Sequence, residues 1–89
     1  MASRISVDEL AVRDVLKKCI LLVEDAGMAL NGVKKALSSA EIQGWNDESY
    51  SAFAEDYSQS EKKIKDALKD IEELSVPKLK GILRSISEF

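Results

Sequence analysis

The sequence predicts an all-α protein, built as an antiparallel helical hairpin with a short C-terminal helix. Three observations carry this prediction. Apolar residues recur at heptad spacing along two long stretches, a short segment of turn-forming residues separates them, and the one proline lies near the C-terminus. With 89 residues, of which 45% are hydrophobic and 33% charged, the chain fits one globular or coiled-coil domain spanning residues 1–89.

The first helix is expected over about residues 7–40. Ser6 and Glu9 have the spacing of a capping box, in which each side chain accepts from the other residue's backbone amide. Gly27 and Asn31-Gly32 disfavour a helix, but the seven-residue phase passes through both unchanged, so we expect one continuous helix. Its apolar stripe occupies the a, d and e positions of the heptad and includes Val12, Val15, Leu16, Cys19, Leu22, Val23, Ala26, Leu30, Val33 and Leu37.

An elbow is expected at about residues 41–46, followed by a second helix over about 47–74. Gln43 and Gly44 have helix-ending chemistry, and Asn46 or Asp47 can cap the next helix. Ser60 is a polar gap in the second apolar stripe, which comprises Tyr50, Phe53, Tyr57, Ile64, Ala67, Leu68, Ile71 and Leu74.

The segment around Pro77 predicts a break before a last amphipathic helix at about residues 76–88. Proline is accepted in a first helical turn but clashes in a helix interior. The apolar positions of this helix are Leu79, Ile82, Leu83 and Ile86.

Composition argues against several classes of function. A net charge of -3 disfavours a nucleic-acid partner, and we expect no membrane span. The chain has no histidine and one cysteine, Cys19, which is interpreted as a small core residue, so we expect no cofactor and no metal. Carboxylates such as Asp66, Asp70 and Glu73 are scattered among lysines along helix faces, and we assign no catalytic residue and predict that the protein is not an enzyme.

The first helix has more apolar surface than one hairpin seam can cover. Leaving part of the run from Ile20 to Val23 in water would be a sizeable loss, because each fully buried Leu or Ile is worth about 1.5–3 kcal/mol. Two hairpins could pair into a four-helix bundle, as a homodimer or a heterodimer. Alternatively, the C-terminal helix could fold back over the stripe, and the sequence leaves both solutions open. The predicted partner interface is Val12, Val15, Leu16, Cys19, Leu22, Val23, Leu30, Val33 and Leu37.

The elbow resembles that of the Trp-x-Gly (WXG) family of ESAT-like substrates of type VII secretion. Trp45, the small residue Ser49 and Phe53 match the motif, whereas Asp47 stands where the family has glycine. Many family members also carry a Tyr-x-x-x-Asp/Glu export signal beyond the hairpin. Here Tyr57 and Glu61 have that spacing but fall inside the second helix, where chance accounts for the match.

This resemblance implies a non-enzymatic, protein-binding function in type VII secretion. The chain would be exported without a cleaved leader, since Met1 to Arg4 lead directly into the capping pattern, and would be secreted or displayed at the cell surface. It would travel as a dimer or act as the helper of a larger effector by pairing with that protein's helical domain. The alternative is a cytoplasmic four-helix-bundle adaptor or toxin-immunity protein.

Overall fold

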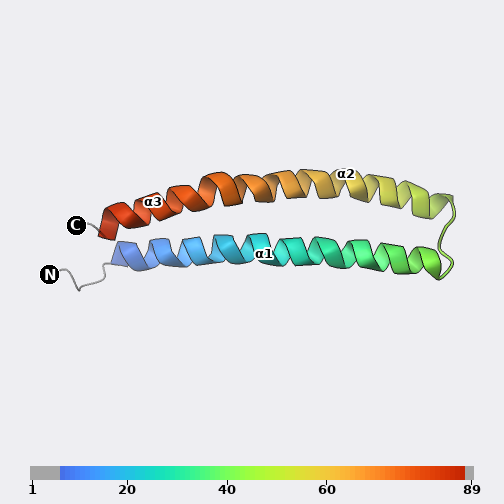
Figure 1. Cartoon of the computed structure of the whole chain (residues 1–89), viewed down its shortest axis with the longest axis horizontal. Helices are drawn as coiled ribbons and strands as arrows, with labels where there is room; N and C mark the ends of the chain where they lie inside the picture. Colours follow the sequence, from blue (N-terminus) through green and yellow to red (C-terminus); the bar gives the residue numbers. More distant parts are fainter. Residues whose placement is uncertain (1–6, 88–89) are drawn as a thin grey trace.

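The computed structural model describes residues 7–87, which form two antiparallel helical arms (Figure 1). The first arm is one helix, α1 (Val7–Ile42), and the second comprises α2 (Glu48–Asp70), a π-helical turn η1 (Ile71–Ser75) and α3 (Val76–Ser87). The all-α prediction is confirmed, and α1 continues through both glycine positions. The chain measures 66 × 19 × 13 Å, so it is a rod. Ser6 of the expected capping box and residue 88 of the expected last helix lie outside the described residues.

The seam between the arms uses two of the seven heptad positions on each arm. In α1 these are the a and e positions, where the side chains are buried or half-buried: Val12, Leu16, Cys19, Val23, Ala26, Leu30, Leu37 and Ala40. The corresponding positions of the second arm up to η1 are Tyr50, Ala54, Tyr57, Glu61, Leu68 and Ile71. Glu61, rather than the expected Ser60, therefore occupies the seam.

The expected break near Pro77 is absent, because a π-helical turn carries the helix through it. Pro77 has no N–H, and its ring would collide with the carbonyl of Glu73 in a regular helix. In η1 the Val76 amide donates to the carbonyl of Ile71, five residues earlier, which widens the turn and absorbs one extra residue.

This extra residue decides which side of α3 faces α1. If the regular helix of α2 continued without η1, the seam positions would fall on Ser75, Lys78, Ile82 and Ser85. With η1, it passes instead through four apolar residues, which are buried or half-buried: Val76, Leu79, Leu83 and Ile86. The last helix thus extends α2 in line and covers the N-terminal half of α1 as part of the same arm (Figure 1).

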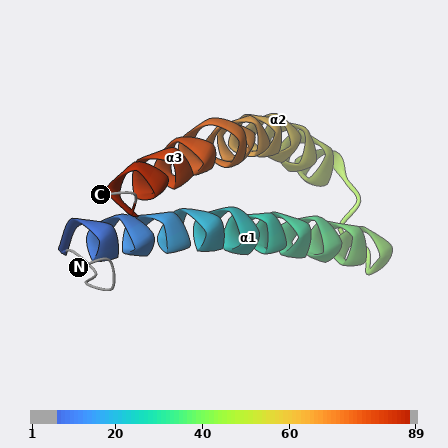
Figure 2. The same ribbon diagram turned by 60° about the vertical axis from the view of Figure 1, so that its left-hand side comes forward.

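The two arms approach each other unevenly along the rod. The α2–α3 arm curves over α1 and lies nearest to it at α3 (Figure 2). Nearer the elbow, the Tyr57 hydroxyl donates to the backbone carbonyl of Leu30 at 3.2 Å and ties the arms together. At the open end, Glu9 is only 8% exposed and its carboxylate accepts from Arg13 at 2.8 Å.

The hairpin covers little of its apolar surface. Leu30 and Val76 are the hydrophobic side chains of the described region that are almost fully buried, at 8% exposure each. The chain's accessible surface is 7014 Å². A compact monomer of its mass would have about 5,200 Å², so roughly 1,800 Å² remains in water that a globule would cover.

Candidate protein-binding site

The elbow begins with a Schellman-type end of α1. Gly44 has φ 120°, a backbone conformation that glycine adopts without a Cβ clash. The Gly44 amide donates to the Glu41 carbonyl at 3.2 Å, and the Trp45 amide donates to the Ala40 carbonyl at 2.9 Å. The chain therefore reverses over a few residues, and Trp45 is fixed directly after the turn.

Asp47 caps the start of α2 and holds the elbow together. Its Oδ1 accepts from the Ser49 amide at 3.0 Å, the Tyr50 amide at 3.2 Å and the Ser49 hydroxyl at 2.6 Å. Ser49 Oγ in turn accepts from Trp45 Nε1 at 2.8 Å. The hydrogen bond from the Ser49 hydroxyl, followed by that from the Tyr50 amide, lowers the pKa of the Asp47 carboxyl below its ordinary value.

An aromatic row continues from this network along α2. Trp45 meets Tyr50 edge-on at 5.2 Å between ring centroids and lies 6.2 Å from Phe53, which stacks on Tyr57 at 6.4 Å. Trp45 remains 39% exposed and Phe53 48% exposed. The structure thus brings together the four predicted elbow residues, Trp45, Asp47, Ser49 and Phe53, and leaves the Trp45 and Phe53 rings partly open to solvent.

The predicted partner interface of α1 divides into two sets. The covered set faces the chain's own second arm: Val12, Leu16, Cys19, Val23, Leu30 and Leu37. The remaining residues, Val15, Leu22 and Val33, are 49%, 50% and 39% exposed. Much of the stripe predicted for a partner is therefore occupied within the hairpin, and a partner can reach the d positions Val15 and Leu22 together with Val33, an a position that remains exposed.

The second arm has an equivalent row of exposed residues at seven-residue spacing. Phe53 and Ala67 each precede a seam position by one residue, as Val15 and Leu22 do in α1, and the exposed Leu74 follows Ala67 by seven residues. In antiparallel right-handed helices that face each other, equal offsets from the seam lie on the same side of the hairpin. We define this exposed stripe by Val15, Leu22, Ala29, Val33, Ala36, Phe53, Ala67 and Leu74.

The candidate export signal is part of the seam. Tyr57 is half-buried and bonded to the Leu30 carbonyl, and its pKa is raised above the ordinary value by desolvation and, secondarily, by Glu61. The Glu61 side chain is only 13% exposed, with Lys65 3.7 Å away. Glu61 Oε2 is buried without a hydrogen-bond partner, so this pair is turned toward α1.

Two further features of residues 7–87 bear on possible function. No three metal-ligating side chains come together there, and Cys19 is half-buried in the seam. In the same region, no helix is both long and apolar enough to cross a bilayer.

Comparisons with family models, curated proteins and solved structures found no match to this chain. Its exposed stripe and elbow are therefore the features that support a function.

Proposed function

We propose that the chain is a non-enzymatic binding module that pairs through its exposed stripe with a second helical hairpin, forming a four-helix bundle. The observation that carries this proposal is the row of exposed apolar side chains on a hairpin whose total surface of 7014 Å² is roughly 1,800 Å² more than a compact monomer exposes. A standard protein interface takes about 800 Å² from each partner, so the surplus is sufficient for one.

The exposed stripe has the composition of a bundle interior. It combines branched aliphatic residues with alanines, and its seven-residue repeat is the spacing that packs knobs into holes between helices. Leu22 is 50% exposed in the single hairpin. Covering the rest of such a side chain yields about 1 kcal/mol, and several stripe residues together provide the affinity of a stable pair.

Within this proposal, the pathway is type VII secretion, and the partner is a second copy or the helical domain of a larger effector. The support is the elbow, where Trp45, Ser49 and Phe53 stand at the positions of the Trp-x-Gly motif. Asp47 replaces the motif glycine and acts as the N-cap of α2. The protein is then exported with its partner, while Trp45 and Phe53 offer an exposed aromatic surface at the tip of the rod.

Two measurements test the proposal. In solution, the purified chain is expected to form a pair, or to be a single hairpin that melts at low temperature, because its stripe is unsatisfied. A heat-resistant monomer would contradict partner binding. In the source cell, the protein is expected in the medium only while the type VII ATPase is active, and strictly cellular protein would favour an adaptor or immunity role.

A further inference from the structure

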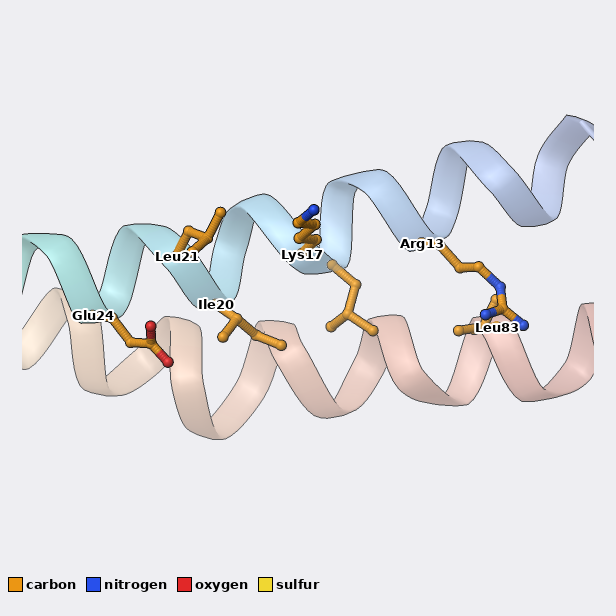
Figure 3. Close-up of a pocket in the computed structure, with 7 residues that line it drawn as sticks. Arg13, Lys17, Ile20, Leu21, Glu24 and Leu83 are labelled. Atoms are coloured by element: carbon orange, nitrogen blue, oxygen red, sulfur yellow. The ribbon is translucent and has the colours of Figure 1, made fainter.

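A groove between α1 and α3 lies on the other side of the hairpin from the exposed stripe (Figure 3). Ile20 follows the seam residue Cys19, whereas Leu22 precedes the seam residue Val23, which places Ile20 and Leu22 on opposite faces. The groove encloses about 350 Å³ and is lined by Arg13, Leu16, Lys17, Ile20, Leu21, Glu24 and Leu83.

The floor of the groove is apolar, and its rim carries charges of opposite sign. Ile20 points toward α3 and is 37% exposed, whereas Leu21 is 42% exposed and lies at the outer edge, on the side of α1 away from α3 (Figure 3). Lys17 and Glu24 lie seven residues apart along α1, about 10 Å, on either side of these two residues. Within the described chain neither Lys17 nor Glu24 forms an ion pair, whereas Arg13 is held by Glu9.

We propose that the outer edge of this groove, the face of α1 with Lys17, Ile20, Leu21 and Glu24, packs against α1 of a second copy, running antiparallel about a two-fold axis between Ile20 and Leu21. In that arrangement, residues whose numbers sum to 41 face each other across the interface. Lys17 of each copy meets Glu24 of the other, so both charge pairs are satisfied by one symmetric contact. The same helix of the other copy brings an identical apolar centre of Ile20 and Leu21.

The uncovered surface is large enough for this contact in addition to the one through the exposed stripe. The chain exposes roughly 1,800 Å² more than a compact chain of its mass would, and this excess is about twice the 800 Å² that a standard interface takes from one partner. The groove contact therefore goes beyond the proposed function. It would join stripe-paired units through the opposite faces of their hairpins, and each unit has two such faces.

Charge reversal tests the pairing directly on the full chain. Lys17→Glu or Glu24→Lys alone sets like charges against each other at both symmetric positions, and self-association through the groove is expected to weaken at least tenfold. Lys17→Glu/Glu24→Lys restores opposite charges and is expected to recover association. If the double variant behaves like either single one, or if all three match the wild type, the proposal is wrong.

Site-specific cross-linking provides a second test, in a Cys19→Ala background. Leu21→Cys lies beside the two-fold axis, so its two copies are expected to form a disulfide under mild oxidation. Leu10→Cys is the matched control, because Leu10 is also an exposed leucine of α1, at 56% against 42% for Leu21, but its counterparts would lie about 30 Å apart. Equal cross-linking of the two variants would overturn the proposal.

Leu22→Asp separates this contact from the one through the exposed stripe. Added to Leu21→Cys, it is expected to leave the cross-link intact and the solution mass at two copies. If the wild type contains more than two copies and the Leu22→Asp variant has the same mass, the exposed stripe does not pair. That outcome would count against the stripe contact and not against the groove contact. A monomeric Leu22→Asp chain without cross-linking would count against the groove.

Discussion

Replacing the Asp47 cap should destabilise the hairpin measurably without touching the seam. The carboxylate accepts from two backbone amides and from the Ser49 hydroxyl at 2.6 Å, and Asp47→Ala removes all three bonds. Loss of an N-cap costs about 0.5–2 kcal/mol, and the Ser49 hydroxyl also loses its acceptor, so we expect the upper half of this range. For a domain of this size, each kcal/mol lowers Tm by roughly 4–8 °C.

The effect should depend on pH in a defined direction. The pKa of Asp47 is lowered in the folded chain from 3.8. Its stabilising contribution is therefore complete above the unfolded pKa and is lost as the pH falls through the lower folded value. Thermal melts followed by far-ultraviolet circular dichroism, at neutral and at acid pH, measure both effects.

Asp47→Asn is the matched control, since asparagine caps helices as well as aspartate does but cannot ionise. It should retain most of the stability at neutral pH and lose the pH dependence that Asp47 contributes. If Asp47→Ala melts at the wild-type temperature at neutral pH, the cap does not hold the elbow and the reasoning fails.

Five further substitutions probe the arms and the surface. Tyr57→Phe should lower the free energy of unfolding by about 0.5–1.5 kcal/mol in urea melts, because it removes the hydroxyl that bonds the arms, and no change would mean that this bond is not formed in solution. Gly44→Ala should lower the free energy of unfolding by about 1 kcal/mol or more, because φ of Gly44 is 120°. Gly32→Ala should raise it by about 1 kcal/mol, because a Cβ at Gly32 would meet nothing within 4 Å. Melts that show the opposite order would contradict this contrast. Leu22→Asp should weaken stripe pairing at least a hundredfold in sedimentation equilibrium, because it places a carboxylate in the apolar contact, while Lys65→Ala should leave pairing intact. A Leu22→Asp variant that associates to the same extent as the wild type would exclude the exposed stripe.

The heptad pattern predicted the helices and the turn between them because it records which residues are apolar. It placed the long α1 across Gly27 and Gly32, and the chemistry of Gly44 and Asp47 located the elbow. It did not separate Leu16 from Val15, since adjacent apolar residues look alike until a second helix covers one of them.

Two features had no clear signal in the sequence. Glu61 in the seam was missed because a charged residue is ordinarily assigned to solvent, and only the register fixed by Tyr57 brings it inside. The hydrogen bond from Trp45 to Ser49 follows from the turn geometry, although the four-residue spacing of a donor and a hydroxyl could have suggested it.

The π-helical turn η1 has a consequence for how this arm tolerates changes in length. Because Ile71–Ser75 already accommodates one surplus residue, deleting a single residue there would restore the uninterrupted heptad register and keep Leu79 and Leu83 against α1, with a kink where Pro77 meets the preceding turn. The same deletion within α2 would rotate everything between it and η1 by about 100° and turn its seam residues outward. Alignment of this arm with uninterrupted heptad sequences therefore requires a one-residue gap at η1.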